Sequence, residues 1–265
     1  MSHPHAARKT HSQHERTLTA RLRGRQGRNL WFGLFIAPFL TGLIVFVYVP
    51  IGWSTVLSFF DARATLHPTT FVGWRNYQYL LTDPLFRDSL LVFTVFALFI
   101  VPLTYLCSLA LALALDNVTR FRAFFRSAFF LPAACSYVVA AMVWRLSFFN
   151  GARFGFVNSI LHRFGADQIN WLDGQGYWYW IALVSLRLWL QVGYYMILLI
   201  AGLNRISPST YEAAALDGAG RWQILRHITL PQLRATSAAV LMLLLIGAFQ
   251  AFDEFYNMLA TAGTY

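Results

Sequence analysis

Long apolar blocks alternate with short polar segments along this chain. Each block consists mainly of Leu, Phe, Val, Ile and Ala, carries almost no charge, and is about 20 residues or longer, the length at which an α-helix crosses ~30 Å of hydrocarbon. The pattern predicts five membrane-spanning helices, at residues 30–58, 89–115, 127–149, 177–203 and 236–258. In the first block, Pro50 predicts either a kink or a continuation of the helix, from Trp53 to Phe60, beyond the outer surface.

Composition supports an all-α polytopic membrane protein. Of the 265 residues, 57% are hydrophobic and 12% are charged, whereas a soluble domain carries about 25% charged residues. The two cysteines, Cys107 and Cys135, lie within apolar blocks and indicate small buried hydrophobes, not a disulfide framework. The polar first 29 residues precede a long apolar block without a small-residue cleavage site, so we expect a retained anchor in place of a cleavable signal peptide.

The charged residues orient the predicted spans. Residues 1–29 hold seven Arg and Lys against one Glu, residues 116–126 hold three Arg against one Asp, and residues 204–235 hold four Arg against two acids. These three segments sum to 14 − 4 = +10, which is the whole formal net charge of the chain. Because positive loops stay in the cytoplasm, we expect the amino terminus and both loops inside and residues 254–265 outside. A nucleic-acid surface is a poor alternative, since spans separate the basic segments.

The loop at 205–234 has an unusual local design. Ser207 to Thr210 supply a helix N-cap and a proline, an Ala-rich helical turn follows, and Gly218 and Gly220 permit a sharp turn. A second short helix then places one apolar stripe, formed by Trp222, Leu225 and Ile228/Thr229, until Pro231 stops it. An amphipathic surface loop is the plainer interpretation. Small residues beside a lone acid, however, favour a knob that enters a groove on another protein.

The motifs of this loop are Glu212-Ala213-Ala214, then Asp217-Gly218-Ala219, then Ile228-Thr229-Leu230-Pro231. At this spacing they resemble the EAA loop of binding-protein-dependent ABC importer permeases, in particular the carbohydrate-uptake permeases of the maltose and glycerol-3-phosphate type. Segments 71–77, 124–132 and 201–207 are also similar to that family, so the resemblance extends over most of the chain.

The resemblance implies a type I importer permease bundle whose loop docks as a coupling helix in a cleft of a separate ATPase subunit. Glu212 would make charge-assisted hydrogen bonds, Ala213 and Ala214 would allow close approach, and Gly218 would form the turn. The implied coupling residues are Glu212, Ala213, Ala214, Asp217, Gly218, Ala219, Ile228, Leu230 and Pro231. The implied partners are two ATP-binding cassette subunits, a second permease, an extracytoplasmic solute-binding protein and the lipid membrane.

ATP hydrolysis is expected on the partner and not on this chain, because the sequence has no Gly-x4-Gly-Lys-Ser/Thr pattern. The sequence predicts no cofactor and no metal site. Two departures from the family stand out: Ala235 replaces a frequent proline, and the sequence ends at Tyr265, soon after the fifth block, where the resemblance implies a sixth span. Either the sequence is a truncated fragment or the last helix is absent, and we expect truncation.

A candidate solute site lies in the fourth block. Arg187, Gln191, Tyr194 and Tyr195 follow one another at i, i+4, i+7 and i+8 and so share one helical face. Aromatic rings and hydrogen-bonding groups together suit a sugar. The alternatives are a polar contact between helices or an Arg187 side chain that snorkels to the surface. Sugars, polyols and sugar phosphates all remain open as substrates.

Polar and aromatic residues crowd the outer end of the fifth block. Asp253, Tyr256 and Asn257 are candidates for an external gate or for a contact with the solute-binding protein. An aromatic belt with interfacial acids explains these residues almost as well.

Rival functions find less support in the sequence. A secondary, ion-coupled transporter predicts carboxylates within the spans, whereas Asp61, Asp116, Asp253 and Glu254 all lie near predicted span ends. A membrane enzyme would need a catalytic cluster, and the histidines outside the tail are dispersed among loops. We interpret residues 1–29 as a disordered cytoplasmic tail and residues 30–265 as the permease domain of a cell-membrane protein. The four histidines of the tail are a weak alternative as a metal site, since their spacing matches no ordered site.

Overall fold

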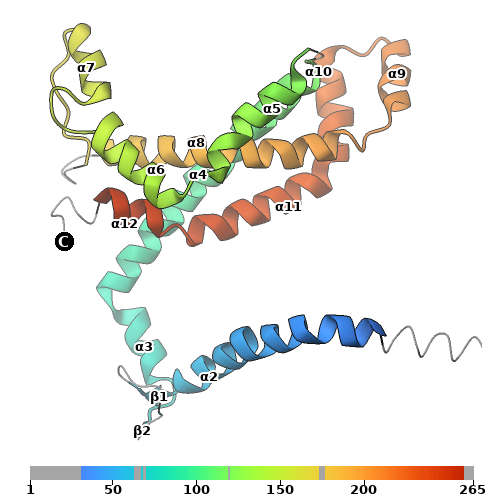
Figure 1. Cartoon of the computed structure of the whole chain (residues 1–265). Helices are drawn as coiled ribbons and strands as arrows, with labels where there is room; N and C mark the ends of the chain where they lie inside the picture. The colour runs from blue at the N-terminus through green and yellow to red at the C-terminus, as the bar shows by residue number, and fades with distance from the viewer. Residues whose placement is uncertain (1–30, 63–66, 68–69, 119, 173–176, 260–265) are drawn as a thin grey trace, which may run out of the picture. The chain divides into compact units, whose positions relative to one another are not determined.

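The computed structural model describes residues 31–62, 67, 70–118, 120–172 and 177–259, and the predicted tail at 1–29 lies outside this part of the chain. Helices make up most of it (Figure 1). Four helices are long and apolar enough to cross a membrane, and a bent pair raises the number to five. The predicted all-α polytopic fold is therefore confirmed. The chain forms two compact units, one up to Arg87 and one from Asp88 onward.

In the first unit, Pro50 is accommodated without breaking the helix that runs from Trp31 to Leu57. A π-helical turn, η1 (Ile44–Tyr48), precedes the proline, and α2 (Val49–Leu57) continues beyond it. The extra residue in this turn makes room for the proline ring, and it shifts the hydrogen-bond pattern so that the N–H that proline lacks is not needed. The remaining elements of this unit are β1 (Phe60–Asp61), β2 (Thr70–Phe71), which pairs with β1 in antiparallel fashion, and α3 (Arg75–Thr82).

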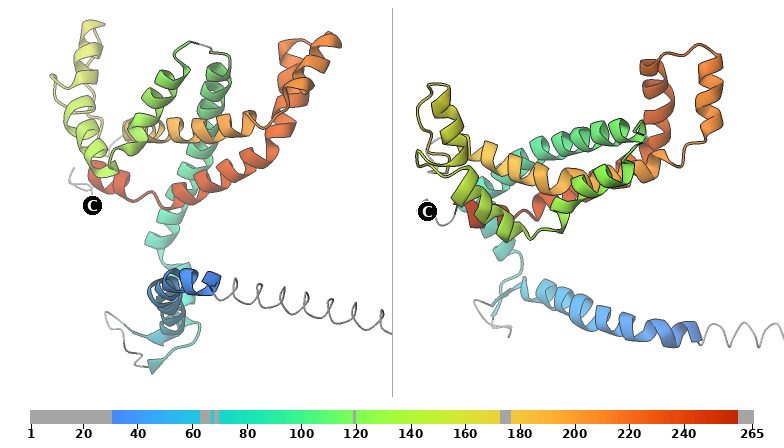
Figure 2. Two further views of the ribbon diagram at one scale, coloured as in Figure 1. Left: turned by 45° about the vertical axis from the view of Figure 1, so that its right-hand side comes forward. Right: turned by 45° about the horizontal axis from the view of Figure 1, so that its top comes forward.

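The second unit is organised around α8 (Trp178–Leu203), which other helices surround in both views of Figure 2. Half of the residues in its most apolar stretch are buried. The fully buried ones include Leu183, Leu186, Met196 and Leu199. The neighbouring helices are α4 (Pro84–Asp116), α5 (Arg122–Phe130), α6 (Tyr137–Val143), α11 (Leu230–Phe249) and α12 (Asp253–Leu259). Side-chain hydrogen bonds join α4 to its neighbours, from Tyr105 to Ser237 at 2.7 Å and from Ser108 to the Val192 carbonyl at 3.0 Å.

The third predicted span, 127–149, is wrong as a single helix. It consists of Arg122–Ala134 and Tyr137–Phe148, two helical segments that meet at 93°. A 3₁₀ turn, η2 (Leu131–Ala134), ends the first segment, and Cys135 and Ser136 adopt extended backbone. Pro132 lies within this turn and lacks the N–H that an α-helix would need there. The second segment ends in a π-helical turn, η3 (Trp144–Phe148).

The fifth predicted span, 236–258, also has different ends. A continuous helix runs from Arg221 to Phe249 and comprises α10 (Arg221–Ile224), the π-helical turn η4 (Leu225–Thr229) and α11. Pro231 does not stop it, contrary to our expectation, because η4 accommodates this proline as η1 accommodates Pro50. After Phe249 the helix breaks, and α12 follows as a separate short helix.

A buried asparagine organises the segment between α6 and α8. Asn158 lies in α7 (Phe156–Arg163) and is 1% exposed. Its amide nitrogen donates to the carbonyls of Asn150, Ala152 and Ile169, and its oxygen accepts from the Ile169 N–H and the Trp171 indole. One side chain thereby satisfies the backbone of a non-helical turn, which is the usual condition for burying such a turn.

Two glycines let the helices around α8 approach closely. A Cβ at Gly193 would lie 1.7 Å from the Phe129 carbonyl oxygen of α5, and one at Gly202 would lie 2.7 Å from Leu233 and Thr236 of α11. Gly193 thus approaches the backbone of a neighbouring helix and Gly202 approaches side chains of one, and small residues at such contacts are a usual means by which membrane helices pack.

We expect Gly193→Ala to destabilise the bundle by about 1–3 kcal/mol or more, because the contact is with backbone and neither helix can yield locally. The loss would appear as a lower unfolding temperature of the purified protein in detergent. Gly52→Ala is the matched control, since a Cβ there meets nothing within 4 Å and alanine favours helix. Equal unfolding temperatures for the two variants would contradict the close packing of α5 on α8.

Candidate functional site

The predicted helix–turn–helix at 205–234 forms as a self-supporting hairpin. Its first helix, α9 (Pro208–Leu216), begins after Ser207 in extended backbone and has Pro208 at its first position, as predicted. Gly218 closes the turn with φ +74°, and the Ala219 N–H reaches back to the Ala214 carbonyl at 3.0 Å. This left-handed glycine with a back-bonded N–H is a common helix C-cap.

Two further hydrogen bonds hold the second half of the hairpin. The Gln223 side chain accepts from the Gly220 N–H at 2.7 Å and so caps α10. The hydroxyls of Tyr211 and Thr229 lie 3.3 Å apart and join α9 to η4. Two alanines were predicted to allow close approach of a partner. Ala214 is buried within the chain, whereas Ala213 is exposed.

An exposed knob, which we define as Glu212, Ala213, Leu216 and Trp222, remains on the hairpin. Leu216 is 89% exposed and Trp222 is 67% exposed. Within the predicted apolar stripe, Trp222 is exposed and Thr229 is buried. Leu216 was not among the predicted site residues, although its i+4 spacing from Glu212 puts both on one face of α9. Large apolar side chains at a loop tip point to a protein contact.

The remaining predicted coupling residues flank this knob. Asp217, Gly218 and Pro231 are exposed, and Ala219, Ile228 and Leu230 are partly buried. The hairpin lies at one end of α8, and α7 lies at the opposite end, in each view (Figures 1 and 2). Because α8 is about 39 Å long at 1.5 Å per residue, the two regions are separated by the thickness of a bilayer.

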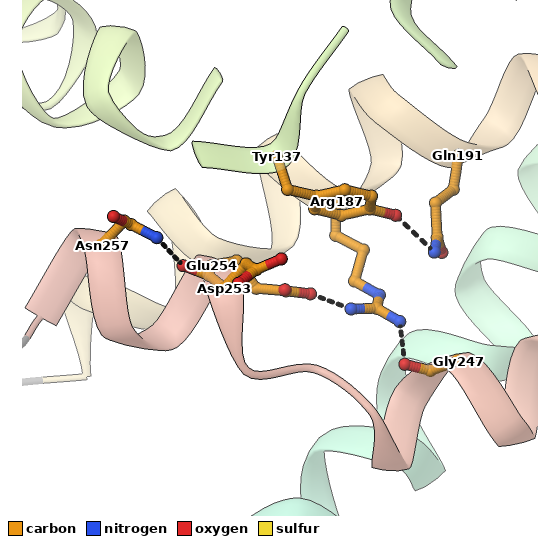
Figure 3. A network of polar contacts seen from close by, with 7 residues as sticks. All are labelled: Tyr137, Arg187, Gln191, Gly247, Asp253, Glu254 and Asn257. Carbon is orange, nitrogen blue, oxygen red and sulfur yellow. Dashed lines mark hydrogen bonds and ion pairs between the residues drawn. The ribbon is translucent and has the colours of Figure 1, made fainter. Parts of the chain in front are cut away.

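The four predicted solute residues divide into two groups. Arg187 is 3% exposed and forms an ion pair with Glu254 of α12, while its second terminal nitrogen donates to the Gly247 carbonyl of α11 at 2.5 Å (Figure 3). The guanidinium also lies over the Phe96 ring, 5.6 Å from its centroid. Arg187 is thus the polar contact between helices that we considered as an alternative.

Glu254, which the sequence places near the end of a span, has a buried side chain. It is 2% exposed, because the helix break after Phe249 turns α12 back toward α8. Arg187 contacts residues on both sides of that break: the Gly247 carbonyl belongs to the last turn of α11, and Glu254 belongs to the first turn of α12. A carboxylate bound to arginine has its charge compensated, which differs from the exchangeable carboxylate that ion coupling needs.

The other three predicted solute residues line one cavity of about 200 Å³. Gln191 and Tyr195 are partly and fully buried, respectively, and Tyr194 is exposed. The Gln191 amide donates to the Tyr137 hydroxyl at 2.8 Å, and the rings of Tyr194 and Tyr195 contact edge to face with centroids 5.1 Å apart. The full lining comprises Ala133, Tyr137, Leu190, Gln191, Tyr194 and Tyr195. Sequence reasoning missed Tyr137, which comes from the broken third span.

The candidate gate residues lie on α12 beside the buried pair. Tyr256 is 55% exposed and stacks on Phe252 at 5.3 Å between centroids. The Asn257 amide donates to the Asp253 carbonyl at 2.7 Å, within the helix (Figure 3). The Asn257 carbonyl accepts from Arg145 at 3.4 Å. Exposed Asp253 and Tyr256 therefore present the polar and aromatic face of α12.

Comparisons with known proteins agree with this architecture. Residues 107–264 match the family described as binding-protein-dependent transport system inner membrane component. The arabinooligosaccharides transport system permease protein of Bacillus subtilis is 34% identical over 227 residues, which are 84% of this chain and 70% of that protein.

Two solved structures of bacterial alginate transporters share the fold. One, an ABC transporter involved in the import of the acidic polysaccharide alginate, aligns with a TM-score of 0.72 and 25% identity over 90% of this chain and 80% of that one. The other, in complex with an alginate pentasaccharide-bound periplasmic protein, aligns with a TM-score of 0.71 and 25% identity over 90% and 79%. The chain belongs to the family of binding-protein-dependent transport system inner membrane components.

Proposed function

We propose that this chain is the permease subunit of an ATP-binding-cassette importer that moves a sugar or a related solute across the cell membrane. The observation that carries the proposal is the self-supporting hairpin with its exposed knob, at the end of α8 opposite to α7. A docking element at one end of the bundle and a cavity within it are the two parts that an externally driven permease needs.

The hairpin is the docking element for the ATPase in this proposal. Glu212 would accept charge-assisted hydrogen bonds, Ala213 would allow close approach, and Leu216 and Trp222 would enter an apolar cleft. The positive charge of loops 116–126 and 204–235 supports a cytoplasmic hairpin and a cytoplasmic amino terminus. The ATPase is a separate subunit, since this sequence contains no phosphate-binding Gly-x4-Gly-Lys-Ser/Thr loop.

Two ATPase subunits, a second permease and an extracytoplasmic solute-binding protein complete the assembly. The alginate importer complex with a periplasmic protein supports the last of these partners. The exposed face of α12, with Asp253, Tyr256 and Asn257, is then the external gate beside which the binding protein releases its solute.

Reconstitution tests this function. The chain, co-purified with the ATPase and permease subunits with which it assembles, is placed in proteoliposomes with ATP and the solute-binding protein on their respective sides. We expect solute to accumulate only when ATP and the binding protein are both supplied. Uptake that follows an ion gradient and ignores ATP would instead indicate a secondary transporter.

The cavity formed by Gln191, Tyr194 and Tyr195 lies on the solute path. We expect the combined change Gln191→Ala and Tyr194→Ala to lower uptake at least about tenfold, since the loss of one hydrogen-bond partner and one stacking ring removes about 1.4 kcal/mol or more of solute binding. Uptake kinetics in the same proteoliposomes measure the effect. Ile181→Ala, a half-exposed α8 residue outside the cavity, serves as the control. Unchanged kinetics in the double variant would remove the cavity from the path.

A further inference from the structure

The cavity beside α8 contains no charged residue among its lining side chains. Its walls come from η2, α6 and α8 and consist of two aliphatic residues, three tyrosines and one glutamine. At about 200 Å³ it has the volume of several water molecules, at about 30 Å³ each. A single ring or a short polyol chain fits such a space, which makes the chemistry of the lining informative about the solute.

The guanidinium of Arg187, on the same helix as the cavity, is already paired with an acid. Its two terminal nitrogens contact Glu254 of α12 and the Gly247 carbonyl of α11 (Figure 3), whereas the residues that line the cavity belong to η2, α6 and α8. Glu254 compensates the charge of the guanidinium, and both side chains are 3% exposed. The one cation of α8 therefore already has a counter-charge within the chain and does not line the cavity.

Gln191 provides the complementary observation. Its amide nitrogen donates to the Tyr137 hydroxyl, but its amide oxygen is buried and has no hydrogen-bond partner within the described chain. A buried polar atom of this kind points to a missing partner. The orientation of a glutamine amide is assigned from its contacts. If the amide is turned, Tyr137 donates to the oxygen, and the unpartnered group becomes the amide N–H₂.

A hydroxyl satisfies Gln191 in either orientation, because it both donates and accepts. A phosphate or carboxylate only accepts, and it also needs a cation or several donors in a buried site. We propose that this cavity selects an uncharged, hydroxyl-bearing solute, a neutral sugar or polyol, over sugar phosphates and uronates. This inference rests on the proposed role of the cavity in the solute path. The fold alone does not decide between neutral and acidic solutes, because a transporter with the same fold imports the acidic polysaccharide alginate.

A panel of solutes matched in shape and different in charge tests the inference. The pairs are glucose and glucose 6-phosphate, galactose and galacturonate, and sorbitol and sorbitol 6-phosphate, with binding to the purified importer in nanodiscs measured by equilibrium dialysis. In every pair that binds, we expect the neutral member to bind at least tenfold more tightly. Gln191→Leu should weaken neutral binding about tenfold. Tyr105→Phe is the control, because it also removes a hydrogen bond between helices but lies outside the cavity.

Equal or tighter binding of the anionic members overturns the inference, as does neutral binding that Gln191→Leu leaves unchanged, or a panel in which no member binds. ATP-driven uptake is measured separately. Uptake of an anionic solute would overturn the inference and leave the proposed importer function intact. Neutral binding that is sensitive to Gln191, without ATP-driven uptake, would overturn the importer function and leave the selectivity of the cavity intact.

Discussion

Glu254→Ala is expected to destabilise the folded bundle by about 3–5 kcal/mol, because it leaves the guanidinium of Arg187 buried without its counter-charge. The loss is large compared with the total stability of about 5–15 kcal/mol that native proteins have. Thermal or denaturant unfolding of the purified protein measures it. The double variant Arg187→Met with Glu254→Leu removes both charges and keeps apolar volume, so we expect it to recover most of the lost stability.

The ion pair of Asp116 and Arg122 is the matched control. Its atoms approach to 2.6 Å, yet the two side chains are 41% and 33% exposed. We expect Asp116→Ala to change stability by no more than about 1 kcal/mol, since water screens the exposed pair. If Glu254→Ala and Asp116→Ala are equally mild, or if the double variant is as unstable as Glu254→Ala, the buried pair does not hold α12 against α8.

Gly218→Leu and Glu212→Lys are each expected to abolish transport while the protein still inserts and folds. A side chain at Gly218 meets nothing within 4 Å in the chain itself, so its bulk affects the partner and not the hairpin. The left-handed backbone adds a strain of about 1–2 kcal/mol. Glu212→Lys reverses the charge of an exposed residue that the ATPase would bind. ATP-driven uptake and co-purification of the ATPase measure the two effects.

Gly165 provides the matched control for the substitution at Gly218. It has φ +77°, against +74° for Gly218, and a Cβ there also meets nothing within 4 Å, but it follows α7 at the other end of α8. Gly165→Leu therefore imposes the same backbone strain without touching the hairpin, and we expect wild-type uptake. Full transport by Gly218→Leu and Glu212→Lys, or an equal loss in Gly165→Leu, would argue against hairpin docking.

The sequence predicts the presence of the spans better than their continuity. Hydropathy averages over about 20 residues and registers apolar length, which is why the spans appear where the structure has apolar helices. Breaks depend on a few backbone groups. Pro132 ends a helix and Pro231 does not, because a π-helical turn precedes Pro231. Nothing in the local sequence distinguishes these two cases, since the π-helical turn depends on how the surrounding helices pack.

The parts of the candidate site that are local in sequence are likewise more predictable than the parts that depend on breaks between helices. The hairpin is predictable because its caps, its glycine turn and its motif residues are all local in sequence. The ion pair joins residues 67 apart, and it requires the break after Phe249, which hydropathy cannot reveal. Tyr137 joins the cavity for a similar reason, since the 93° bend of the third segment brings it beside α8.

The helix from Arg221 to Phe249 has a mechanical consequence. It has 29 residues and so is about 43 Å long, and it begins at the hairpin and ends at the break that Arg187 bridges. If the ATPase docks on the hairpin as we propose, this helix would transmit a displacement of the hairpin to the break after Phe249. The contacts of Arg187 with Glu254 and with the Gly247 carbonyl would then resist this displacement at the far end of the helix, so the closure of the ATPase would have to supply enough energy to rearrange them.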